Sequence, residues 1–330
     1  MRRALPILLA VLAASLASCG DDPQESSRVR GDTLTIYASL PAHGVDAPAG
    51  AAAALGMRAA LAEAGNRAGG RDVRFVRLPA TRPGDLTWDP GTVEANAERA
   101  ADDATTIAYL GELDGGASAV SLPVTNRKQI LQVSPADSLT SLTETPPGRP
   151  RAGPERYYPE ERRTFVRLVP ADVAAARRIV ADLREGDTQR LAIVSGDGIA
   201  DHELEGMLLG LIGTGQPRTI TRVAAPSEDE DEDAESVTEL VEELTDADPE
   251  TIVYVAADGP RTRAAVAALR SGLPSVELIH APRARSERCA RALGRRAMRL
   301  TLAAIDAAGP DRLAVVKAAK AAGDRLTPCR

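Results

Sequence analysis

Short apolar runs alternate with longer amphipathic stretches along most of the chain. The short runs are rich in β-branched residues, and strands are expected at 34–37, 73–76, 107–110, 130–133, 165–169, 191–194, 219–223, 252–255 and 276–279. Between them apolar residues recur at helical spacing, and helices are expected near 54–65, 92–103, 117–126, 172–183, 202–211, 236–244, 261–270, 293–307 and 310–322. This repeated strand-then-helix order predicts an α/β fold of mainly parallel sheets with right-handed crossovers.

A proline-rich segment divides this pattern into two sets. Residues 141–159 lack a periodic apolar pattern and contain five prolines, so we expect a connection there and not a core element. The two strand–helix sets predict two similar lobes, in which ligands bind outside the carboxyl ends of the strands. The acidic run 228–233 is expected to form a solvent-exposed loop, because like charges repel one another.

The first residues indicate export. Two arginines precede the apolar run 5–17, and Leu16-Ala17-Ser18-Cys19 follows, which is the order of a secretory signal. Cys19 supplies the thiol that a lipoprotein signal needs for its diacylglyceryl group, so we expect lipidation there. An ordinary signal with an incidental cysteine is the alternative. The apolar run is shorter than the roughly 20 residues that a membrane-spanning helix needs.

Charge and cysteine content refine this interpretation. The formal net charge is −7, and loss of the two arginines with the signal makes the mature chain still more acidic, which argues against nucleic-acid binding. If Cys19 is lipidated, only Cys289 and Cys329 remain. An even number of cysteines in an oxidising compartment favours a disulfide between them, with two free thiols as the alternative.

Catalytic and metal-binding motifs were sought in the same way. Ser195 lies in Val-Ser-Gly-Asp-Gly, which lacks the Gly-x-Ser-x-Gly frame of a nucleophilic serine, and the chain has no phosphate-binding loop motif. His43, His202 and His280 each follow an expected strand, but no pair has a short metal-ligand spacing. We therefore expect no catalytic residue, no metal and no cofactor, and a protein that is not an enzyme. Trp88, the only tryptophan, is expected to anchor a loop.

Several short segments, taken in order, carry a family resemblance. Residues 36–44 (IYASLPAHG) join a strand to a Ser-Leu-Pro turn, and residues 64–71 (AGNRAGGR) end the first helix. Residues 114–118 (DGGAS) follow the third expected strand, and residues 132–140 (QVSPADSLT) begin at the end of the fourth. In these features the chain resembles the type I periplasmic (solute) binding proteins, in particular the branched-chain amino-acid (Leu/Ile/Val) substrate-binding proteins of ABC transporters.

This resemblance implies a two-lobed, Venus-flytrap fold, with a mainly parallel sheet flanked by helices in each lobe. The expected organisation is a lipoprotein signal peptide at 1–18, a tether at 19–31, an N-terminal lobe formed by 32–167 plus 284–330, and a C-terminal lobe at 168–283. Because the segment 282–291 is brief, the C-terminal lobe could be shortened relative to the family.

The resemblance also suggests which residues contact the ligand. The loop after the third strand would contribute Gly115 and Gly116, and the loop after the fourth would contribute Ala136, Asp137 and Ser138. In the family, backbone amides of the former loop hold the carboxylate of the ligand. His43 and Asp258 are further candidates, although Asp258 also stands where it can cap the helix that follows it.

Two functions follow from these observations. The first is a solute receptor of an ABC importer, lipid-anchored to the outer face of the cytoplasmic membrane, which binds an amino acid or similar small polar solute and presents it to a permease. The second is an anchored sensory or interaction lipoprotein that keeps the fold but has lost solute binding. Gly115, Ala200 and Asp258 stand where the family has a hydroxyl or aromatic side chain, which favours the second function.

Overall fold

Two separate β-sheets organise the computed structural model, which describes residues 27–228, 235–257, 259–280 and 286–322. The first sheet has the order β2-β3-β1-β4-β5-β6 and is parallel except for the β2–β3 pair. Its strands are β1 Thr33–Leu40, β2 Arg67–Ala68, β3 Arg71–Pro79, β4 Thr106–Leu110, β5 Leu131–Ser134 and β6 Phe165–Arg167. The second sheet, of order β10-β9-β7-β8, is parallel throughout. Its strands are β7 Arg190–Ser195, β8 Thr219–Ala224, β9 Thr251–Val255 and β10 Glu277–His280.

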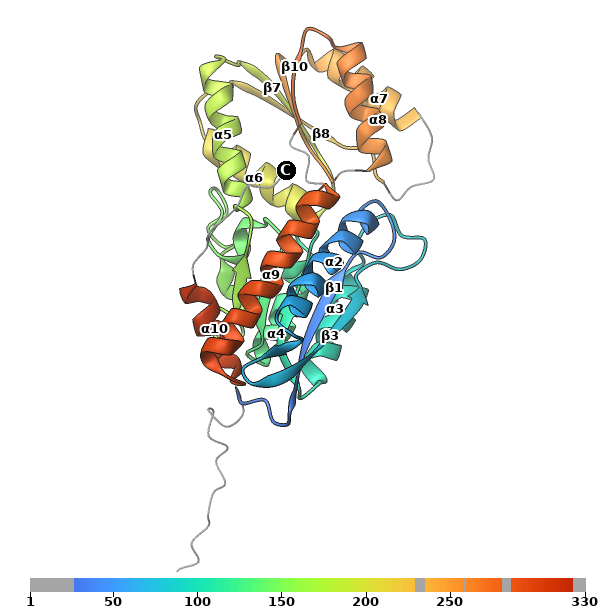
Figure 1. Ribbon diagram of the computed structural model, residues 1–330. Helices are drawn as coiled ribbons and strands as arrows, with labels where there is room; N and C mark the ends of the chain where they lie inside the picture. Colours follow the sequence, from blue (N-terminus) through green and yellow to red (C-terminus); the bar gives the residue numbers. More distant parts are fainter. Residues whose placement is uncertain (1–26, 229–234, 258, 281–285, 323–330) are drawn as a thin grey trace, which may run out of the picture.

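Helices surround each sheet, and the two helix–sheet units form two lobes, one above the other in Figure 1. The first sheet is flanked by α2 Ala47–Glu63, α3 Pro90–Asp102, α4 Ser118–Arg127, α9 Glu287–Ala308 and α10 Arg312–Ala321. The second is flanked by α5 Asp172–Glu185, α6 Ile199–Ile212, α7 Glu235–Ala247 and α8 Pro260–Gly272. The chain therefore builds most of the first lobe, then the second, and returns with α9, which lies beside α2.

The central strands of each sheet, such as β1 and β4 in the first and β7 and β9 in the second, are buried on both faces, as expected for a parallel sheet between helices. Successive side chains of a strand point to opposite faces, so neighbouring residues enter different cores. In β1, Ile36 belongs to the core shared with α2 and α9, whereas Tyr37 belongs to the core shared with α3. In β7, Ile193 packs with α5 and α6, whereas Val194 packs with α7 and α8. These apolar runs are continuous because both of their faces are covered.

The contact between α2 and α9 depends on glycine. A Cβ atom on Gly294 would lie 2.2 Å from the carbonyl oxygen of Ala53, and one on Gly56 would lie 2.0 Å from the carbonyl oxygen of Arg291. Both distances are far below a van der Waals contact, so the two backbones approach as closely as they do only without a side chain at these positions. Small residues thus build a large part of a core in a chain with 2% aromatic residues.

The predicted α/β class is confirmed, and every expected strand and helix overlaps an observed one. The prediction for 141–159 was wrong in one respect. This segment forms two short 3₁₀ turns, at Thr140–Leu142 and Pro154–Tyr157, yet it contributes to a core. That core consists of Leu122, Leu139, Leu142, Tyr157, Tyr158, Phe165 and Ala200. Proline interrupts the periodic spacing of apolar residues but does not prevent their burial. The lack of such spacing in 141–159 was therefore no evidence against a place in the core.

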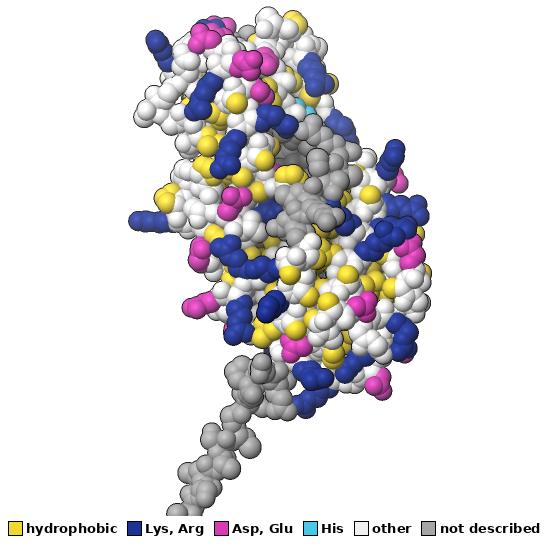
Figure 2. Space-filling model, turned by 60° about the vertical axis from the view of Figure 1, so that its left-hand side comes forward, with side chains coloured by type: hydrophobic (Ala, Val, Ile, Leu, Met, Phe, Trp, Pro, Cys, Tyr) yellow, Lys and Arg dark blue, Asp and Glu magenta, His cyan; other side chains and the backbone are white. Residues whose placement is uncertain are grey.

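The surface offers no single dominant feature in the view of Figure 2. Acidic and basic side chains are interspersed there over both lobes. Within the described part of the chain, no helix combines the length and the apolar character needed to cross a bilayer.

Candidate functional site

A cavity of about 290 Å³ lies between the two lobes, at the carboxyl ends of strands from both sheets. The first lobe lines it with Asp46, Thr87, Trp88, Leu113, Asp114, Gly115, Ala136 and Ser138. The second lobe lines it with residues 195–198, 200–202, 224–228, 256–257 and Thr262. These residues follow β1, β3, β4 and β5 in one sheet and β7, β8 and β9 in the other. Its position agrees with the rule that such sheets bind ligands where strand-end loops meet helix N-termini.

The residues expected to bind ligand lie at different depths. Gly115, Ala136 and Ser138 line the cavity, whereas His43, Gly116 and Asp137 do not. His43 is exposed, and its backbone N–H donates to the Thr81 hydroxyl at 2.8 Å. Asp258 lies outside the described residues, as do Cys19 and Cys329. Ligand contact by these residues, the lipid anchor and the disulfide remain predictions; Cys289 itself is buried in the first turn of α9.

Asp137 occupies the N-terminus of α4 from inside the lobe. Its Oδ1 accepts from the backbone N–H of Gly116 at 3.1 Å, and its Oδ2 accepts from that of Ser118 at 2.9 Å. Oδ1 also accepts from the N–H of Leu139 at 3.0 Å. Helix N-termini attract anions because of such unpaired amides and the helix dipole. Here an internal carboxylate already satisfies both amides, so the positive end of α4 is neutralised on the cavity side.

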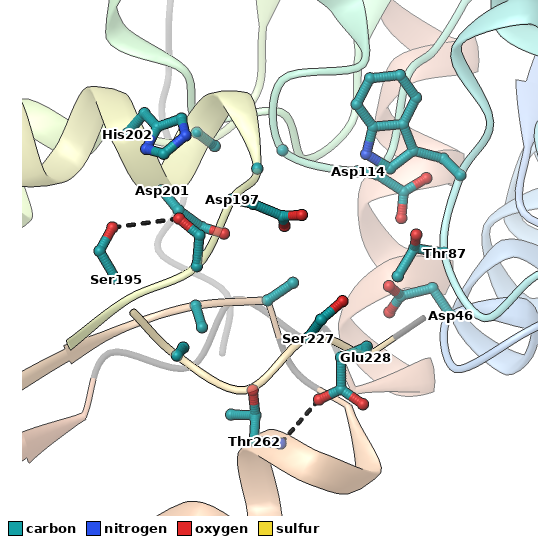
Figure 3. Close-up of a pocket in the computed structure, with 18 of the residues that line it drawn as sticks. Asp46, Thr87, Asp114, Ser195, Asp197, Asp201, His202, Ser227, Glu228 and Thr262 are labelled. Atoms are coloured by element: carbon teal, nitrogen blue, oxygen red, sulfur yellow. Dashed lines mark hydrogen bonds between the residues drawn. The ribbon is translucent and has the colours of Figure 1, made fainter. Parts of the chain in front are cut away.

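Asp46 and Asp114 place two carboxyl groups side by side in the first-lobe wall (Figure 3). The Oδ2 atom of Asp114 is buried and has no hydrogen-bond partner among the described residues. Burial raises the pKa of Asp114 well above its ordinary value, and the neighbouring charge of Asp46 raises the pKa further. The wall therefore holds a carboxyl group that lacks a positive partner.

The second-lobe wall carries three more acidic side chains. Asp197 is exposed and Asp201 is buried, both near the N-terminus of α6. Glu228 accepts from the backbone N–H of Arg261 at 3.1 Å and from that of Thr262 at 2.7 Å, which caps α8. In Figure 3, Asp197 and Glu228 lie across from Asp46 and Asp114. Glu228 lies in a loop after β8, as expected, but it is half-buried there and accepts from the unpaired amides of α8. Residues 229–233 lie outside the described residues.

Trp88 was expected only to anchor a loop, but it also lines the cavity. It is half-buried, lines the cavity, and packs against Ala80, Val93 and Ala117. The available signal was its position in a loop that follows an expected strand, at the edge of the sheet where ligands bind. Trp88 therefore both anchors its loop and lines the cavity.

The three histidines are not gathered in one place. His202 lines the cavity, and His280 stands edge-on to the ring of Tyr254 with centroids 5.8 Å apart. His43 lies outside the cavity lining. Across the described ranges, no group of three His, Cys, Asp or Glu side chains has the arrangement of a metal site.

Several solved structures are similar in fold to this chain. The chain matches a benzoate-bound solute-binding protein of an ABC transporter from R. palustris with a TM-score of 0.64 and 14% identity, over 87% of this chain and 85% of that chain. It matches a leucine-binding protein from Thermotoga maritima MSB8 with a TM-score of 0.60 and 16% identity, over 87% of each chain. A leucine-bound ABC transporter substrate-binding protein from Desulfitobacterium hafniense gives 0.64 and 15%, over 88% and 89%.

These matches show that the chain has the two-lobed fold of the type I periplasmic solute-binding proteins. The expected fold is thereby confirmed. The sequence itself matches no family model and no curated protein.

Proposed function

We propose that this protein is the extracytoplasmic solute-binding lipoprotein of an ABC importer. The observation that carries the proposal is the interlobe cavity, which loops from both lobes line at the carboxyl ends of their strands. Its volume of about 290 Å³ suits a small molecule. The proposal is supported by structural neighbours that are solute-binding proteins of ABC transporters, solved in complex with benzoate or leucine. Closure of the lobes would enclose the solute and present it to a permease.

No catalytic step is needed for this role. A receptor of this kind contributes affinity and a closed conformation, and the transporter supplies the energy for import. The cavity also gives no support to nucleic-acid binding, since its described lining contains neither lysine nor arginine. Export and anchoring form part of the proposal, supported by the apolar run 5–17 and by Cys19. A chain with Cys19→Ala is expected to leave the membrane fraction.

The open cavity favours solute binding over a purely sensory or interaction role. A protein that had lost its solute would be free to fill the cleft with large side chains. Here Gly115, Ala136, Ala200, Ala224 and Ala256 keep much of the wall small. These residues leave the space empty at the very point where the two lobes face each other.

Thermal unfolding with a solute panel tests the proposal. The purified chain is heated with amino acids, aromatic carboxylates, amides and amines, each in excess. A ligand at 100 times its dissociation constant stabilises the folded state by about 2.7 kcal/mol, which is readily measured. We expect at least one class to raise the melting temperature. A flat response across every class would contradict the receptor function and favour the sensory alternative.

A further inference from the structure

We infer that the solute is an organic cation, a small molecule with a protonated amine held between Trp88 and the carboxyl groups of Asp46 and Asp114. This inference rests on the proposed function and names the chemical class of its ligand. An organic cation differs in charge from benzoate and leucine, the ligands in two of the solved neighbours.

The charge of the cavity wall is the first argument. Among the described lining residues, five side chains are carboxylic (Asp46, Asp114, Asp197, Asp201 and Glu228), and none is a lysine or an arginine. A cleft lined by one sign of charge between low-dielectric walls concentrates ions of the opposite sign. The same wall repels a carboxylate, so an aromatic acid would lose affinity here.

Two arginines lie beside the cavity but outside its lining, and one of them is paired with carboxylates. Arg82 and Arg261 line a wider hollow that adjoins the cavity through Thr87, Trp88 and Glu228. Arg82 pairs with Asp85 at 3.0 Å and with Asp89 at 3.3 Å. Arg261 donates from its side chain to the carbonyl oxygen of Ser227 at 3.0 Å. The guanidinium of Arg82 is thus matched by carboxylates of its own loop.

The second argument is the loss of the anion site. In a helix N-terminus of this kind, free amides and a charge equivalent of about +0.5 would attract a carboxylate. Asp137 accepts from the amides of Gly116 and Ser118 and brings a full negative charge to the end of α4. The end of α4 therefore offers a ligand less positive potential than a helix N-terminus with free amides would. A carboxylate ligand finds the amides of Gly116 and Ser118 already occupied.

The third argument is the pairing of a buried acceptor with an aromatic face. The Oδ2 atom of Asp114 is buried without a hydrogen-bond partner among the described residues, and Asp46 lies beside it. A buried carboxyl oxygen without a donor is costly, and an ammonium N–H would satisfy it. Trp88 lines the same wall, and indole attracts a cation placed within about 6 Å of its ring. Together the three side chains would form the first-lobe wall of an ammonium-binding subsite.

The test is a binding comparison by ligand charge. The purified full chain is titrated by calorimetry with choline, putrescine and agmatine as cations, benzoate as an anion and leucine as a zwitterion. Intrinsic fluorescence gives a second readout, because Trp88 is the only tryptophan. We expect at least one cation to bind and to change this fluorescence, whereas benzoate binds at least tenfold more weakly than that cation.

Matched variants locate the site. Asp114→Asn and Asp46→Asn are each expected to weaken binding of the cation at least tenfold. Asp182→Asn makes the same substitution on the exposed side of α5 and is expected to change affinity less than twofold. Trp88→Phe should retain part of the affinity that Trp88→Leu loses, since only phenylalanine keeps an aromatic face. If one variant does not fold, the other carboxamide and the tryptophan pair still decide.

Each outcome has a distinct meaning. Binding of benzoate or leucine without any cation would overturn the inference and leave the receptor function intact. Binding of Mg²⁺ or Ca²⁺ alone would also overturn it, in favour of an inorganic cation. Cation binding that is unaffected in both carboxamide variants would overturn the assigned subsite. A chain that binds none of the probes would contradict the cation inference, and the broader panel would then decide the receptor function.

Discussion

Glu112 carries a fully buried carboxyl group in the first lobe. It is fully buried, its Oε1 accepts from the Tyr109 hydroxyl at 2.7 Å, and its Oε2 has no partner within the described ranges. Burial raises its pKa from 4.5 to about 7, and the charge of Asp137 contributes in the same direction. The folded state therefore holds a proton that the unfolded state releases near pH 4.5.

This raised pKa makes stability depend on pH. Between pH 4.5 and about 7 the folded state binds more protons than the unfolded state, so the free energy of unfolding falls as pH rises. The loss amounts to about 3 kcal/mol above pH 7. Glu112→Gln is expected to raise the free energy of unfolding by up to about that amount at pH 8 and by less than about 1 kcal/mol near pH 5. Denaturant melts at both values measure this difference.

The control for this prediction is Glu98→Gln, which removes an exposed carboxylate of α3. It is expected to leave the stability difference between the two pH values unchanged. If Glu112→Gln gave the same gain at pH 5 and pH 8, protonation of this residue would not be its cause.

Residue-level reasoning from the sequence succeeded or failed according to the kind of signal involved. Ser138 and Ala136, which line the cavity, were suggested by the family resemblance, which rests on the order of short segments along the chain. The capping of α4 by Asp137 was not, because that residue is 21 positions from Gly116 in the chain. The role of Trp88 and the unpaired oxygen of Asp114 also depend on how two lobes meet, which no local pattern encodes.

At the scale of elements, the α2–α9 contact leaves no room for a side chain at Gly294. Gly294→Ala would place a Cβ atom 2.2 Å from the carbonyl oxygen of Ala53, so the two helices must separate. Overpacking of this kind typically costs about 1–3 kcal/mol. We expect a loss of that size in the free energy of unfolding, measured by urea denaturation.

Gly91→Ala is the matched change in an open environment. Gly91 lies in the first turn of α3, and a Cβ atom there would meet only the Asp89 carboxylate, at 3.6 Å. Replacement of a helical glycine that has room is expected to be neutral or to stabilise by about 0.4–1 kcal/mol. A gain at position 294 like that expected at position 91 would show that helix propensity, and not close approach, governs position 294.

The elements themselves were largely predictable, since each buried strand is an apolar run and each helix has a periodic apolar face. α2 began earlier than expected, at Ala47, because the alanine- and glycine-rich residues 49–53 carry little hydrophobic contrast. The two-residue strand β2 was missed because it is held by β3 and not by its own composition. The 3₁₀ turns at 140–142 and 154–157 lack any periodic signal and depend on partners in α4, β6 and α6.

At the scale of the whole molecule, α6 connects the two lobes. Its body packs in the second lobe, yet Ala200 near its start belongs to a core built mainly from the first lobe and the connection. The carboxylate of Glu203 accepts from the backbone N–H of Ser141 at 3.0 Å, and the guanidinium of Arg149 donates to the carbonyl oxygen of His202 at 2.8 Å. Because α6 also lines the cavity with residues 200–202, a change in lobe contact here reaches the solute site.

We therefore expect Glu203 to couple the unfolding of the two lobes. Glu203→Ala leaves the buried N–H of Ser141 without an acceptor, which costs about 1–3 kcal/mol. Calorimetry should show a melting temperature lowered by several degrees and a broader transition, as the lobes begin to unfold separately. Glu203→Gln keeps an acceptor oxygen and removes the ionisable carboxyl group whose pKa burial raises. This variant should therefore melt close to the natural chain and as sharply. If the alanine variant melted like the glutamine variant, α6 would be packed on the first lobe by its apolar residues alone, and closure of the cleft would not depend on this hydrogen bond.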